Sequence, residues 1–252
     1  MDNRKTIKGY THINVGASHE EMIPNWLAIT IWGGAYEGLE ELKTENDITV
    51  YRHSDFGGDV INHNVNDGLP FEDHSVDVIF SSHFIEHLTF SEAISFLEES
   101  YRVLKPNGIL RIACPDIMIW IDKIHNAKDV EFFETYKNAI DVDYWENSVY
   151  HVKDKIKTNT QVLNSMIYNW GHKWMWDFES LKTELESIGF YSIERMEHLK
   201  SNIGNIKEIE TRLSEDKISA RNLESMFVEC TANKIQPKIQ QPIQVKKSKN
   251  LI

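Results

Sequence analysis

Three histidines of the sequence fall where a catalytic base could be placed. His83 and His87 follow an apolar run at residues 76–81, and His172 lies in an aromatic segment at residues 169–174. We expect all three segments at the carboxyl edge of a parallel sheet. An imidazole there can take a proton from a hydroxyl group, because histidine titrates near neutral pH. His83, His87 and His172 are therefore the candidate catalytic residues.

A metal centre is not predicted from the same histidines. His83 and His87 are four residues apart and could share one face of a helix, but no third ligand follows at a readable spacing. The sequence also lacks the HExxH and Cys-x-x-Cys patterns of zinc sites. Cys114 and Cys230 each lie in an apolar, strand-like run, which indicates small core residues and not a disulfide or a pair of metal ligands.

The elements that must position these residues alternate between strand-like and helical patterns. Such alternation is typical of an α/β fold with a largely parallel sheet. The expected strands cover residues 10–15, 26–31, 47–52, 59–64, 76–81, 109–114, 190–199 and 223–232.

Two helices have clear start signals. Thr89 and Glu92 have the spacing of a capping box, in which each side chain satisfies a free backbone N–H group. Asp177 is the expected N-cap of a later helix that ends at Gly189. The turn at residues 105–108 separates the first helix from the strand after it, so strand, helix and strand form one right-handed crossover unit.

Two further segments stand out by composition. Residues 117–168 are helical and aromatic and are longer than an ordinary crossover, so we expect an inserted helical cap over the carboxyl edge of the sheet. Residues 234–252 hold lysines, prolines and glutamines but no acid, which predicts a flexible basic tail. The tail either aids solubility or docks an acidic partner. Residues 1–233, with the cap inserted among them, form the expected single domain.

Composition excludes several classes of protein. The formal net charge of −12 disfavours nonspecific binding of nucleic acid, because phosphates would be repelled on average. No apolar run is long enough to cross a bilayer, and the first residues lack the apolar stretch of a signal peptide. We therefore expect a cytoplasmic protein with no membrane span and no nucleic-acid partner.

Residues 69–116 resemble the class I S-adenosylmethionine-dependent methyltransferases. The similarity rests on LPFEDHSVDVIFSSHFIEHL and on EESYRVLKPNGILRIACPD, in which Asn107 replaces the first glycine of the family's "RVLKPGG" turn. The resemblance implies a Rossmann-like, mostly parallel sheet with one antiparallel strand, and S-adenosylmethionine as cofactor. The segment GHKWMWDFESLKTELESIGF is similar to a late helix of a subfamily often associated with polysaccharide and small-molecule modification.

The resemblance also implies a set of cofactor-binding residues. Gly16 stands where the first family glycine lets the backbone approach the ligand. Asn64 takes the place of a common aspartate that reads the adenine amino group, and the Val65 N–H would reach a ring nitrogen. Thr30 stands where the ribose-binding acid usually lies. Ser82 follows the strand at residues 76–81, beside the expected sulfonium.

Departures from the family pattern leave alternatives open. The usual run of glycines is reduced to Gly-Ala-Ser at residues 16–18, and Thr30 is not an acid. Asp55 could supply the ribose-binding carboxylate instead. A second hypothesis is a methyltransferase-like protein that has lost cofactor binding and works as a binding or scaffold subunit. A third keeps the fold but binds another nucleotide-like ligand.

The acceptor implied by the resemblance is a small or glycan-like molecule, methylated at oxygen. Asp116 and Trp174 are the expected acceptor contacts. Each also has a structural interpretation, since Asp116 could cap the next helix and Trp174 could pack under the cap with Trp176. His87 follows Glu86 in a pair that is common across the family, which favours a structural role for His87.

Overall fold

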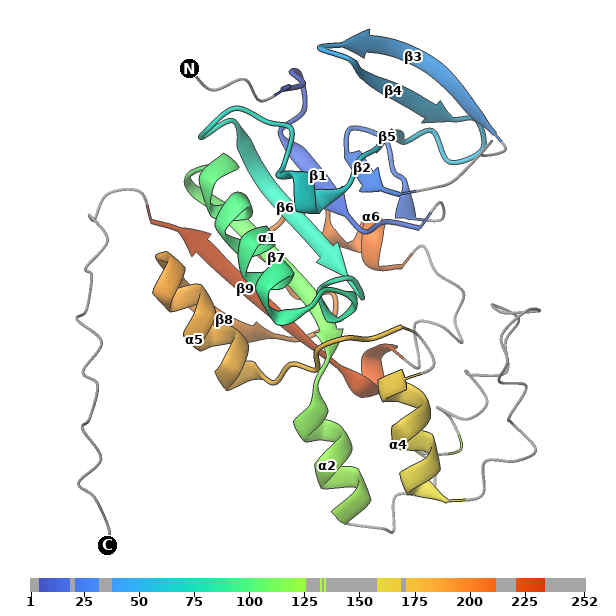
Figure 1. Ribbon diagram of the computed structural model, residues 1–252, viewed down its shortest axis with the longest axis vertical. Helices are drawn as coiled ribbons and strands as arrows, with labels where there is room; N and C mark the ends of the chain where they lie inside the picture. Colours follow the sequence, from blue (N-terminus) through green and yellow to red (C-terminus); the bar gives the residue numbers. More distant parts are fainter. Residues whose placement is uncertain are drawn as a thin grey trace, which may run out of the picture.

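One nine-stranded sheet organises the part of the chain that the structure describes. The computed structural model describes residues 5–18, 21–31, 38–125, 132, 134, 158–168, 171–211 and 221–233. The strand order is β3-β4-β5-β2-β1-β6-β7-β9-β8 (Figure 1). The parallel centre consists of β5 (Asp59–Asn62), β2 (Leu27–Thr30), β1 (His12–Val15), β6 (Val76–Ser82) and β7 (Leu104–Pro115).

The two ends of the sheet differ from the parallel centre. At one end β9 (Ser225–Ala232) runs antiparallel to β7 and to β8 (Phe190–Met196), which is the antiparallel strand that the resemblance implied. At the other end β4 (Ile48–His53) runs antiparallel to β5 and forms a hairpin with β3 (Leu39–Glu45). A strand was predicted at β4, but its antiparallel direction and the strand β3 were not. Asn46 and Asp47 connect the hairpin with φ angles of 51° and 61°, as a tight type I′ turn requires.

Helices α1 (Phe90–Val103) and α5 (Phe178–Ile188) cover one face of the sheet (Figure 1). Both start signals are confirmed, because Thr89 and Asp177 each form a capping box. Gly189 ends α5 in a left-handed conformation. The buried apolar face of the two helices contributes to the main core: Ala93, Phe96, Leu97, Val103, Leu181, Leu185 and Ile188.

The opposite face differs from the βαβ units that the alternating pattern predicted. Between β1 and β2, and between β2 and β5, the described residues form no α-helix. The connection across residues 16–26 is short for a helical crossover, which takes about a dozen residues or more. The short helix α6 (Ile206–Glu210) covers this face instead, and its Ile206 and Ile209 pack with Trp26 and Phe80.

The buried side chain of Arg111 links α6 and the residues before it to the sheet. Arg111 on β7 is fully buried, and its guanidinium donates to Glu210 Oε1 at 2.7 Å and to Glu229 Oε2 at 3.4 Å. Glu229 on β9 also accepts from Ser201 Oγ at 2.6 Å and from the Asn202 side chain at 2.7 Å. These bonds hold residues 197–210 against β7 and β9, where no crossover helix lies.

Beyond the carboxyl end of β7 the chain enters α2 (Ile117–His125), which packs on α4 (Asn159–Tyr168) (Figure 1). Trp120, Val162 and Met166 are buried between them. These helices are the described part of the predicted cap. Most of residues 126–157, and the basic tail at residues 234–252, lie outside the described residues.

Several smaller expectations are also settled. Cys114 and Cys230 are buried free thiols, as predicted. Asn107 adopts the left-handed conformation (φ 64°) that the family's glycine would take.

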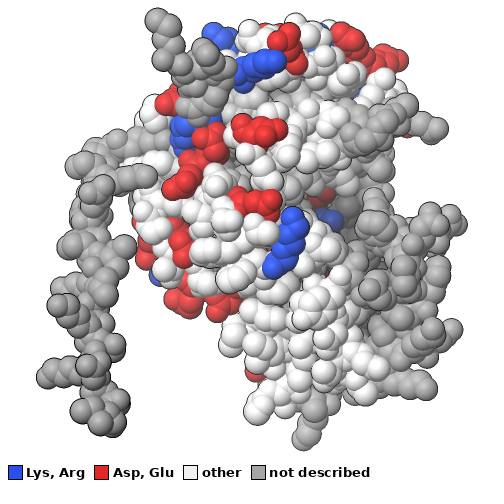
Figure 2. All heavy atoms as spheres, viewed as in Figure 1, with Lys and Arg blue, Asp and Glu red and all other residues white. Residues whose placement is uncertain are grey.

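Acidic side chains are visible over α1 and α5, whereas the visible surface over α2 and α4 is almost uncharged (Figure 2). Among the described residues no helix is both long and apolar enough to cross a membrane.

Candidate functional site

The carboxyl ends of four neighbouring strands form one edge of the sheet. Thr30 at the end of β2 pairs with Asn62 at the end of β5, and Val15 at the end of β1 pairs with Ser81 near the end of β6. The chain leaves β1 toward β2 on one side, and β6 lies on the other, so the strand order reverses at β1. Ligands of open α/β sheets bind at such a reversal. Gly16, Thr30 and Ser82, which sequence analysis assigned to the cofactor, therefore lie at one edge.

Gly16 is required for packing at this edge. It has a φ angle of +80°, and its N–H donates to the carbonyl of Ile29 at 2.8 Å. A Cβ at this position would lie 2.5 Å from a ring carbon of Phe84. The sequence analysis attributed this glycine to close approach of a ligand. The structure gives another reason, because the Phe84 side chain occupies the space that a Cβ would need.

An ion pair lies across the ends of β1 and β6. Arg221 donates to Glu21 Oε1 at 3.2 Å and to Ser82 Oγ at 3.3 Å. Glu21, which is only 4% exposed, also accepts from the N–H and the hydroxyl of Ser18 at 3.1 and 2.9 Å. The cavity that remains between Glu21, Ser82, His83 and Arg221 measures about 20 Å³. A ligand at this position must therefore displace the ion pair.

The remaining predicted cofactor residues follow β5. Asn64 is exposed, and its Oδ1 accepts from the N–H of Asn66 at 3.0 Å, so it caps the 3₁₀ helix η2 (Val65–Asp67). Val65 is buried in that turn. The alternative in which Asp55 replaces the missing acid is wrong. Asp55 lies between antiparallel β4 and β5, at the amino end of β5 and thus at the opposite edge from Thr30.

A larger cavity of about 460 Å³ lies on the other side of β5. This is within the size range of ligand pockets. Its walls come from the β3–β4 hairpin and from the segment after β5, and they include Asp47, Tyr51, Asn62, His63 and Gly68. No sequence motif marks this cavity, because its lining residues meet only through the pairing of β4 with β5.

His83 lies between a carboxylate and a hydroxyl. Its Nε2 is 2.9 Å from Ser225 Oγ, and its Nδ1 is 3.3 Å from Glu86 Oε1. Burial, aided by the charge of Arg221, lowers the pKa of His83 below 6.5, although Glu86 acts in the other direction. His83 is therefore neutral at pH 7, which is the form of histidine that can accept a proton.

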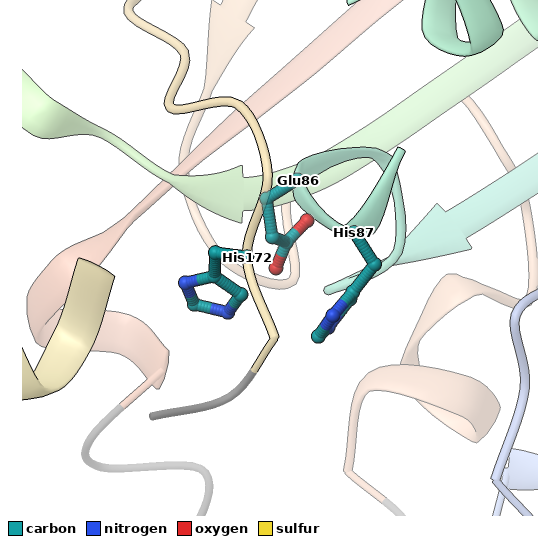
Figure 3. A group of neighbouring side chains, drawn as sticks. All are labelled: Glu86, His87 and His172. Carbon is teal, nitrogen blue, oxygen red and sulfur yellow. The ribbon is translucent and has the colours of Figure 1, made fainter. Parts of the chain in front are cut away.

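His87 and His172 both lie beside the Glu86 carboxylate (Figure 3). Their ring centroids are 4.9 Å apart. The segment that carries His172 is held in place because the N–H groups of Lys173 and Trp174 both donate to the backbone carbonyl of Glu86, at 2.8 and 3.2 Å. Burial lowers the pKa of His172 to about 4. The three predicted histidines thus surround Glu86, which sequence analysis did not select.

The two predicted acceptor contacts differ in their surroundings. Asp116 is fully buried, its Oδ1 accepts from the N–H of Met118 at 2.9 Å, and its Oδ2 pairs with Arg195 at 2.6 Å. These contacts support the alternative role as the cap of α2, because neither oxygen faces solvent. Trp174 is 43% exposed and packs on Phe90, whereas Trp176 is fully buried. Trp174 is therefore accessible to an acceptor, and Asp116 is not.

The groups at the carboxyl edge fit S-adenosylmethionine in kind. Thr30 and Ser82 provide half-exposed hydroxyls, Asn64 provides an amide, and Arg221 provides a guanidinium that matches a carboxylate. A carboxylate at the end of β2, which would hold ribose hydroxyls, is missing. Arg221 was not found from the sequence because it lies in a polar connection without a recognisable motif.

Comparison with known proteins gives one family match. Residues 27–112 match the family model described as a methyltransferase domain. No curated protein sequence matches the chain.

Similar solved structures include a phosphoethanolamine N-methyltransferase 2 of Haemonchus contortus, with 13% identity and a TM-score of 0.44 over 92% of this chain. The chain spans 50% of that protein. A SAM-dependent methyltransferase of Archaeoglobus fulgidus has 15% identity and a TM-score of 0.42, covering 89% of this chain and 87% of its own. A putative methyltransferase of Haloferax volcanii, solved with the activator Trm112, has 14% identity and a TM-score of 0.44 over 93% and 87% of the two chains.

The family match covers most of the parallel centre of the sheet. The matched residues include β2, β5, β6, α1 and most of β7, and therefore the sequence motifs that carry the resemblance. The sheet of this chain has a reversal at β1 and places antiparallel β9 between β7 and β8. Over residues 27–112 the chain is therefore similar to the methyltransferase-domain family.

Proposed function

We propose that this protein transfers a methyl group from S-adenosylmethionine to a hydroxyl oxygen of a small or glycan-like acceptor. The observation that carries the proposal is the gathering of Thr30, Ser82 and Arg221 where the strand order reverses. These groups match the hydroxyls and the carboxylate of the cofactor.

Binding and orientation are the main tasks of the chain in this reaction. S-adenosylmethionine supplies a methyl group on a sulfonium, which an acceptor oxygen attacks in line. Thr30 and Asn64 would hydrogen-bond the nucleoside, and the Val65 N–H would serve its base. Arg221 leaves Glu21 and pairs with the carboxylate of the methionine part. Because Ser82 already contacts Arg221, it holds that guanidinium in reach of the ligand.

His83 is the proposed general base. It directly follows Ser82 in the chain, and its neutral imidazole can take the proton of the acceptor hydroxyl on Nε2, in place of its present contact with Ser225. Glu86 faces Nδ1 and stabilises the imidazolium that forms. Trp174 and Phe90 offer an exposed aromatic surface nearby, which suits the apolar face of a sugar ring.

The acceptor and base are tested together by transfer of a labelled methyl group. Purified protein is incubated with methyl-labelled S-adenosylmethionine and a panel of oligosaccharides and small polyols. With the acceptor found in this way, His83→Gln is expected to lower kcat about 100-fold or more, while affinity for S-adenosylhomocysteine stays unchanged. The matched control is His125→Gln, at the exposed end of α2. Label in amines or carbons only, or full kcat in His83→Gln, would overturn this proposal.

Arg221 is expected to decide affinity for the amino-acid part of the cofactor. Arg221→Gln removes a charge-assisted hydrogen bond, so the Kd of S-adenosylhomocysteine is expected to rise about 10- to 100-fold. 5′-Methylthioadenosine has no carboxylate and serves as the control ligand, since its Kd is expected to stay the same. Calorimetric titration measures both values. An equal change for the two ligands would show that Arg221 acts through the shape of the site and not through the carboxylate.

A further inference from the structure

Glu86 is a buried carboxyl group without a hydrogen-bond partner among the described residues. It lies in the 3₁₀ helix η3 (Ile85–His87), directly after β6, and its side chain is 0% exposed. Neither of its carboxylate oxygens has a hydrogen bond among the described residues, and the contact with His83 Nδ1 at 3.3 Å lacks hydrogen-bond geometry. Burial of an ionised carboxylate is costly unless a cation or several donors compensate it.

Two imidazoles face this carboxylate. Glu86, His87 and His172 each offer one ligand atom, and these atoms all lie within 4.8 Å of one another. Figure 3 shows the Glu86 carboxylate between the two rings. His172 Nδ1 is also buried and has no hydrogen-bond partner among the described residues. The cluster therefore contains unsatisfied electron-pair donors from two distant parts of the chain.

The lysine next to this cluster in the chain is engaged elsewhere. Lys173 is next to His172 in the chain, but its ammonium pairs with Glu92 at 3.5 Å. Imidazole nitrogens and carboxylate oxygens are groups that bind transition-metal ions.

We propose that Glu86, His87 and His172 bind a divalent transition-metal ion of the zinc type. Two imidazoles and one carboxylate are a common ligand set for catalytic zinc and for other transition metals, and they leave a fourth position open. Calcium and magnesium prefer oxygen ligands, so this set disfavours them.

The geometry needs only a small adjustment to hold the ion. Zinc bonds of about 2.0–2.1 Å place tetrahedral ligand atoms about 3.3 Å apart. The half-buried rings of His87 and His172 can turn toward the buried carboxylate to reach this spacing. The backbone bonds from Lys173 and Trp174 to Glu86 already fix the two segments relative to each other. The ion would thus join the turn after β6 to the segment that leads into α5.

Metal binding to untagged protein tests this site directly. After dialysis against a chelator, the protein is titrated with zinc and, separately, with cobalt(II). We expect one ion per chain with a Kd in the micromolar range or tighter, and visible cobalt absorption of a tetrahedral site. Zinc at about 100 times its Kd is expected to raise Tm by about 5–10 °C.

Substitutions separate this site from incidental zinc binding by other histidines. Both His172→Ala and the nearly isosteric Glu86→Gln are expected to lower zinc affinity at least 100-fold. His198→Ala removes a histidine outside the cluster and is expected to retain wild-type affinity. No stoichiometric binding of zinc or cobalt at 1 mM, or equal affinity in all three variants, would overturn the proposal. Because no cofactor is added, the outcome is independent of methyl transfer.

Discussion

Replacing Gly16 by alanine is expected to lower the free energy of unfolding by about 2–5 kcal/mol. Part of the loss, about 1–2 kcal/mol, comes from the left-handed backbone, where the φ angle is +80°. A further 1–3 kcal/mol or so comes from overpacking, because the added Cβ would meet the Phe84 ring at 2.5 Å. Urea unfolding followed by circular dichroism measures the difference.

Gly9 provides the matched control. Its φ angle is +92°, but a Cβ there would have no heavy atom within 4 Å. Gly9→Ala is therefore expected to cost only the backbone part, about 1–2 kcal/mol. If both variants lose the same stability, the contact between Gly16 and Phe84 is not tight, and the glycine is left free for the ligand approach that the sequence suggested.

The second large effect is expected at Arg111. Arg111→Met leaves Glu210 and Glu229 in the interior without their cation, and removing one partner of a buried pair typically costs about 3–5 kcal/mol. Residues 197–210 also lose an anchor, because the guanidinium donates to the backbone carbonyl of Lys200 at 3.0 Å. Thermal and urea unfolding are the measurements.

Lys105 serves as the control for Arg111. It pairs with Asp77 at 2.8 Å, but both side chains are more than a third exposed. Lys105→Met is expected to cost at most about 1 kcal/mol, because solvent screens an exposed pair. A loss below 1 kcal/mol for Arg111→Met would mean that residues 197–210 stay in place without the buried arginine.

The sequence predicted the elements whose signals are local. The cap at Thr89 and the apolar spacing after it specify α1, and Asp177 and Gly189 mark the two ends of α5. Strand β3 was missed because its sequence, LEELKTE, is polar and mostly exposed, so no buried face appears in the pattern. The described residues between β1 and β2 form no α-helix, because the connection at residues 16–26 is short for a helical crossover.

The candidate site was predicted only where a motif marks a strand end. Gly16, Thr30 and Ser82 follow strands that the pattern reveals, and parallel strands end at the same edge. Arg221 and Glu86 were missed because their roles depend on partners far away in the sequence. Glu21 and Ser82 meet Arg221, and His172 meets Glu86, only after the whole sheet has formed.

Calorimetric titration of the purified protein with S-adenosylhomocysteine tests the central claim most directly. We expect one binding site per chain with a Kd on the order of micromolar, as is usual for cofactors and substrates of enzymes. Absence of measurable heat at millimolar ligand would contradict it. The closed pair of Glu21 and Arg221 would then be the permanent state of the cleft, and the chain would serve as a binding or scaffold subunit.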